Sequence, residues 1–154
     1  MTDTYQRLRE DVFALEIYDT HEHLPPFESQ REPDTDVLAE YLTQYFSCDL
    51  VSAGLPMADF RRAEDSSGPL AERWALVEPY WQAARHTGYG RALDVAARDL
   101  YGLPRIDRET IGPLNEAFTA ARAAGGTYRR VLKDKSRILR SVCDRPPAED
   151  CDTE

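Results

Sequence analysis

Apolar residues recur along most of this chain at the three- and four-residue spacing of one helix face. The clearest example begins at Pro69, which suits a first helical turn, and continues to about Arg85 with large apolar side chains on one side. Similar spacing predicts helices at residues 4–15, 36–46, 57–62, 92–101, 107–125 and 128–135. The pattern therefore predicts a mostly helical protein.

Two short runs interrupt the helical spacing and are typical of strands. They are residues 16–20 (EIYDT) and residues 138–142 (ILRSV). Pro25 and Pro26 end regular structure soon after the first run. We therefore expect a mostly α fold with two short β-strands, separated in the sequence by a long helical excursion.

The length, charge and composition of the chain limit the kinds of protein that it can be. It has 154 residues and a formal net charge of −9, which suits one ordinary domain and argues against nucleic acid or an anionic membrane as the main partner. No apolar run approaches the ~20 residues that span a bilayer, and the N-terminus lacks the apolar core of a signal peptide. The chain has an odd number of cysteines, and no two of them are close in the sequence, which fits a reducing compartment; they are Cys48, Cys143 and Cys151. We expect a cytoplasmic protein.

The most distinctive chemistry follows the first predicted strand, in the segment Asp19–Leu24 (DTHEHL). Side chains two positions apart on a strand point to the same face, so His21 and His23 can direct two imidazoles at one point while Glu22 faces away. Two imidazoles on one side are a natural half of a divalent metal site. Glu22 is then expected to form hydrogen bonds rather than to act as a base. For Asp19 two roles stay open: orienting a metal ligand, or capping the end of the strand.

The segment IYDTHEHL, residues 17–24, resembles the first barrel strand of the amidohydrolase superfamily, which carries an H-x-H pair there. The resemblance implies a (β/α)8 TIM barrel, whose active site lies at the carboxyl ends of its strands. It also implies that His21 and His23 bind a divalent metal, usually zinc, which activates a water or polarises an oxygen of a small-molecule substrate. In that family, later strands supply a further histidine and an aspartate as ligands.

A second stretch, Tyr80–Phe118, resembles the helical insertion of the uronate isomerase branch of that superfamily. In that branch the insertion follows the first strand and helps to enclose a sugar-acid site. The resemblance implies that residues 27–126 form such an insertion and that Arg85 or Arg91 pairs with a substrate carboxylate. The plainer interpretation is that these arginines complement the dipole at a helix C-terminus.

A barrel of this type needs about 250 residues. We therefore expect residues 1–143 to be the N-terminal part of a longer enzyme, inactive on its own, and residues 144–154 to be a disordered acidic tail. The function implied by the resemblance is hydrolysis of a small polar substrate by metal-activated water. The alternatives are a uronate isomerase-like aldose–ketose isomerase and a non-catalytic helical interaction module, and assembly into a homo-oligomer stays open.

Overall fold

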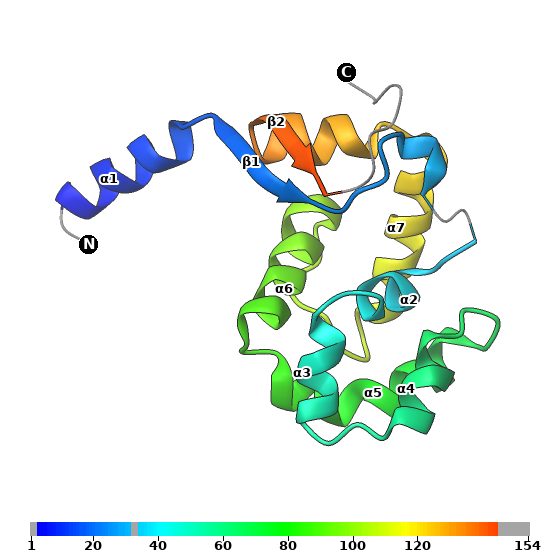
Figure 1. Cartoon of the computed structure of the whole chain (residues 1–154). Helices are drawn as coiled ribbons and strands as arrows, with labels where there is room; N and C mark the ends of the chain where they lie inside the picture. Colours follow the sequence, from blue (N-terminus) through cyan, green and yellow to red (C-terminus); the bar gives the residue numbers. More distant parts are fainter. Residues whose placement is uncertain (1–2, 32–33, 145–154) are drawn as a thin grey trace. The chain divides into compact units, whose positions relative to one another are not determined.

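Two strands that are far apart in the sequence pair in parallel in the computed structural model, which describes residues 3–31 and 34–144 (Figure 1). The chain divides into two compact units. The strand unit contains described residues 3–31 and 126–144, and the helical unit contains described residues 34–125. The predicted insertion at residues 27–126 overlaps the helical unit, but its place within a barrel stays a prediction.

The strand unit is built on strands β1 (Ile17–Glu22) and β2 (Ile138–Cys143). Ile17 pairs with Ile138 and Glu22 with Cys143, with an irregularity in the register between Asp19 and Glu22. Because the strands are parallel, their carboxyl ends lie at the same end of the sheet. Both strands occur where the sequence predicted them, each extended at its C-terminal end.

A short helical turn and a π-helix flank the strands in sequence. The turn is the 3₁₀ helix η1 (Glu28–Gln30), and the π-helix η2 (Arg129–Lys135) lies where a helix was expected. The Glu28 carboxylate accepts the backbone N–H of Thr127 at 2.7 Å and that of Tyr128 at 3.0 Å. This clamp joins segments about one hundred residues apart in the sequence.

We expect Glu28→Gln to destabilise the strand unit in a pH-dependent way. Burial raises the pKa of the Glu28 carboxyl, but the N–H donors of Tyr128 and Thr127 outweigh it, so the net pKa is lowered. A lowered pKa stabilises the fold above the ordinary carboxyl pKa, and that stability is lost as the pH falls through the folded-state value. At pH 7 the loss should be on the order of 1 kcal/mol, because solvent screens this half-buried charge.

Urea denaturation of the wild-type chain and Glu28→Gln at several pH values checks this expectation. The difference between them should shrink as the pH falls from the ordinary carboxyl pKa through the lowered folded-state pKa, and disappear below the latter. Glu16→Gln is the matched control, because Glu16 is exposed in the same unit. A difference that persists unchanged at low pH would contradict the assigned cause.

The first helix of the chain, α1 (Asp3–Ala14), contains no buried residue. Its large apolar side chains, among them Leu8, Val12 and Phe13, are exposed, and Arg9 stacks over the ring of Phe13. The strand unit is therefore held by its strand pairing and by the Glu28 clamp more than by a core.

The helical unit has a continuous apolar core. It is formed by helices α2 (Val37–Leu42), α3 (Phe46–Ser52), α4 (Met57–Glu64), α5 (Leu70–Ala84), α6 (Gly88–Tyr101) and α7 (Ile111–Ala124). Buried side chains of this core include Val37, Leu38, Leu42, Phe46, Leu50, Leu55, Trp74, Val77, Trp81, Ile106, Leu114 and Phe118. Within this core the ring centroid of Trp81 from α5 lies 4.7 Å from that of Phe46 from α3 and 5.1 Å from that of Trp74 from α5. Both tryptophans are 1 % exposed, so the apolar side predicted for this helix is buried.

Capping residues explain several helix boundaries in this unit. Asp36 caps α2 by accepting the N–H of Ala39, and Gly102 ends α6 in the left-handed conformation (φ 73°) that glycine adopts without strain. Asp107 was expected to open a helix directly, but that prediction is wrong, because α7 begins at Ile111. The Asp107 carboxylate instead accepts the N–H groups of Glu109 and Thr110, which closes a separate turn first.

The structure confirms the coarse fold prediction, a mostly helical chain with two short strands, and it pairs those strands in parallel. The described strands form an open two-stranded sheet, and a barrel around them stays a prediction. None of the helices in the described part of the chain is both long enough and apolar enough to cross a bilayer.

Candidate metal centre

The two histidines of the DTHEHL segment lie together at the carboxyl end of β1. His21 is the last residue but one of β1, and His23 directly follows the strand. Their ring centroids are 4.6 Å apart, with the rings nearly perpendicular. The predicted convergence of the two imidazoles is confirmed, whereas their binding of a metal stays a prediction.

Two carboxylates hold the backbone that carries these rings. Asp19 Oδ1 accepts the N–H of His21 at 3.2 Å. Glu22 Oε1 accepts the N–H of His23 at 2.6 Å and that of Leu24 at 3.1 Å. Glu22 therefore forms hydrogen bonds, as expected, and Asp19 stabilises the end of the strand. Both carboxylates contact main-chain groups, so they fix the loop geometry from which the rings project.

Asp144 is a third potential ligand beside the histidines, and sequence reasoning missed it. Ligand atoms of His21, His23 and Asp144 all lie within 4.8 Å of one another, and all three residues are exposed. Asp144 had been assigned to the C-terminal tail, whose other residues lie outside the described part of the chain. Asp144 directly follows the second strand, as His23 follows the first, but only the pairing of the two strands brings these positions together.

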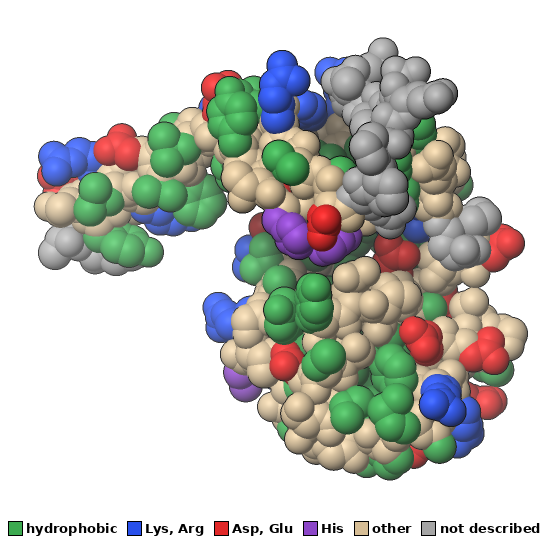
Figure 2. Space-filling view, viewed as in Figure 1, with side chains coloured by type: hydrophobic (Ala, Val, Ile, Leu, Met, Phe, Trp, Pro, Cys, Tyr) green, Lys and Arg blue, Asp and Glu red, His purple; other side chains and the backbone are tan. Residues whose placement is uncertain are grey.

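The parallel register explains why these three side chains meet. Glu22 pairs with Cys143, and the N–H of Asp144 donates to the carbonyl of Glu22 at 2.8 Å. The residues after each strand therefore emerge side by side. Figure 2 shows His side chains and an acidic side chain next to one another on the strand unit, and His21, His23 and Asp144 are all exposed.

The donor set suits a transition metal. Neutral imidazole nitrogens and a carboxylate oxygen are ordinary ligands of zinc and of related divalent ions, whereas magnesium and calcium prefer sites built from oxygen alone. The residues present therefore fit the divalent metal that the family resemblance implies. The two thiols in the described part of the chain are not members of this group: Cys143 donates its S–H to the carbonyl of Leu24 at 3.4 Å, and Cys48 lies in the helical unit.

The two arginines predicted to contact substrate lie in the helical unit. Arg85 caps the C-terminus of α5 and pairs with Asp94 at 3.3 Å, with a second bond to Gln82 at 3.1 Å. Arg91 is exposed in the first turns of α6. For Arg85 the structure thus shows the plainer role at a helix end, and the substrate role of both arginines stays a prediction.

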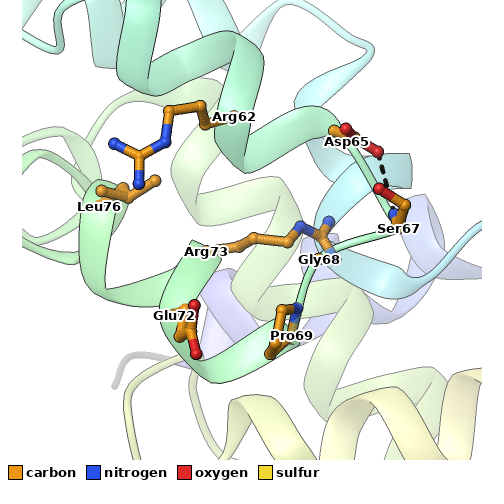
Figure 3. A pocket seen from close by; sticks show the side chains of 8 residues that line it. All are labelled: Arg62, Asp65, Ser67, Gly68, Pro69, Glu72, Arg73 and Leu76. Atoms are coloured by element: carbon orange, nitrogen blue, oxygen red, sulfur yellow. Dashed lines mark hydrogen bonds between the residues drawn. The ribbon is translucent and has the colours of Figure 1, made fainter.

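A hollow of about 210 Å³ lies in the helical unit, between the end of α4 and the start of α5 (Figure 3). Arg73 lines it but is already committed, since its guanidinium forms a two-pronged ion pair with Asp36 and donates to the carbonyl of Ala63. Ser67 donates to Asp65 at the rim and holds the pKa of that carboxyl below its usual value. Arg73 and Asp65, two of the charged residues that line the hollow, are therefore held by structural contacts.

Comparison with known proteins gives no match among protein-family models, curated proteins or solved structures. The functional interpretation therefore depends on the H-x-H segment, its geometry and the resemblance that this segment carries.

Proposed function

We propose that this chain carries the metal-binding part of a metal-dependent hydrolase of the amidohydrolase type, acting on a small polar substrate. The observation that supports the proposal is the convergence of His21 and His23 at the carboxyl end of a parallel strand. Barrel enzymes place their reacting groups at this end of their strands.

The residues of the chain have distinct roles in this proposal. His21 and His23 hold the cation through ring nitrogens, and Asp19 and Glu22 fix the main chain from which both rings project. When bound, a divalent cation lowers the pKa of a water at its open position and polarises a substrate oxygen. The exposure of the pair leaves room for substrate to approach from solvent.

We expect His21→Ala to abolish binding of one zinc equivalent by this chain. Loss of a ligand should raise the zinc dissociation constant by more than about 100-fold, because even the loss of a group that supports a ligand costs about 10- to 100-fold. Isothermal titration with zinc chloride measures the change. His86→Ala is the matched control, since His86 is exposed and lies in the helical unit.

Equal zinc binding by the wild-type chain and His21→Ala would contradict the proposed function. That result would favour a second candidate, a non-catalytic interaction module. The observation behind this candidate is the row of exposed apolar side chains on α1, which includes Tyr5, Leu8 and Val12 (Figure 2). Apolar faces of this kind commonly mark contact surfaces.

A uronate isomerase-like activity is the close alternative within the metal-enzyme class. The compact helical unit between the two strands in the sequence favours it, because that branch carries a helical insertion after its first strand. There the cation would assist proton transfer between neighbouring carbons of a sugar acid. Hydrolase and isomerase require the same histidine pair, so His21→Ala tests the metal site common to both.

A further inference from the structure

The carboxylate of Asp144 lies close enough to the imidazoles to share a cation with them. Donor atoms of the three residues all lie within 4.8 Å of one another. In a tetrahedral zinc site they would lie about 3.4 Å apart, because zinc bonds to nitrogen and oxygen are about 2.0–2.2 Å long. Small side-chain rotations close this difference, and the exposed position of the three residues permits them.

The sheet fixes the main chain of Asp144 beside that of the histidines. Its N–H donates to the carbonyl of Glu22, the residue between His21 and His23, at 2.8 Å. The preceding residue, Cys143, pairs with Glu22 and contacts Leu24 through its thiol. Asp144 therefore occupies a defined place at the end of the strand ladder, next to the segment that carries both rings.

We propose that Asp144 is the third protein ligand of the cation bound by His21 and His23. This inference depends on the proposed metal-binding function and deepens it. Two imidazoles and one carboxylate leave a fourth position open, which is the arrangement of catalytic rather than structural zinc sites. The resemblance places further ligands on later strands, whereas here the second described strand supplies one. The chain then needs no further protein ligand to hold zinc.

The test compares zinc binding by the wild-type chain, Asp144→Asn and Asp134→Asn. Asp134→Asn makes the same chemical change at an exposed position of η2 and is the matched control. Isothermal titration gives the dissociation constant, and cobalt(II) absorption reports the coordination geometry. Asp144→Asn should bind zinc more than about 100-fold more weakly, as expected for the loss of a ligand, with an altered cobalt spectrum, and Asp134→Asn should match the wild type. Because Asp144 is exposed, the far-ultraviolet circular dichroism should not change.

The possible results distinguish a failure of this inference from a failure of the proposed metal-binding function. If His21→Ala loses zinc while Asp144→Asn binds it as the wild type does, the inference is overturned and the proposed function stands. If Asp144→Asn and Asp134→Asn weaken zinc binding equally, the weakening reflects the loss of one negative charge anywhere in the unit, and the inference is again overturned. Absence of zinc binding by the wild-type chain overturns both.

Discussion

Trp81→Ala is expected to lower the free energy of unfolding of the helical unit by about 3–5 kcal/mol. The Trp81 side chain is 1 % exposed and is one of the largest fully buried side chains of the core. Its ring packs edge-on against Phe46 and obliquely against Trp74. Alanine would leave a cavity bounded by two rigid rings from different helices, which cannot collapse to fill it.

Denaturant unfolding followed by circular dichroism measures this loss. Tyr89→Ala is the control, since Tyr89 is 51 % exposed in the same unit and stacks only on the exposed Tyr45. The control should lose less than about 1 kcal/mol. If Trp81→Ala were as stable as the control, the packing assigned to α3 and α5 would be wrong.

Asp36→Ala should have an effect of similar size, for an electrostatic reason. Asp36 forms a two-pronged ion pair with the guanidinium of Arg73, a residue that is 3 % exposed. Removing one partner of a buried pair leaves an uncompensated charge and costs about 3–5 kcal/mol. The same carboxylate caps α2 through the N–H of Ala39, and loss of a cap adds about 1 kcal/mol.

Two further variants make this prediction specific. Asp59→Ala removes a carboxylate from the exposed pair with Arg62 and should cost less than about 1 kcal/mol. In the Asp36→Ala background, Arg73→Met should recover stability, because the stranded charge is removed. If the double variant were no more stable than Asp36→Ala alone, the cost would arise from the cap and not from the buried charge.

Local patterns were enough to predict most of the helices and both strands. Pro69 and the apolar spacing after it predicted the helix that the structure places at Leu70–Ala84. The beginning of α7 was missed because the cap of a separate turn and the cap of a helix use the same residue types, here Asp107 and Thr110. Spacing alone does not distinguish the two.

The histidine half of the site was predictable, and the aspartate was not. His21 and His23 are only two positions apart in the sequence, so local geometry at the end of one strand brings their rings together. Asp144 reaches them only through the pairing of β1 with β2, a contact between segments separated by more than one hundred residues. The sequence predicts each strand separately but carries no local signal of their register.

The central claim is that His21 and His23 share one cation, and imidazole ¹H–¹⁵N correlation spectra during a zinc titration test it most directly. The chain contains three histidines, so His86 is an internal reference, and single His→Ala variants assign the signals. The account predicts that the ring nitrogens of His21 and His23 shift together and saturate at one zinc equivalent, while those of His86 stay unchanged. Unchanged signals from His21 and His23, or equal shifts of all three histidines, would contradict it.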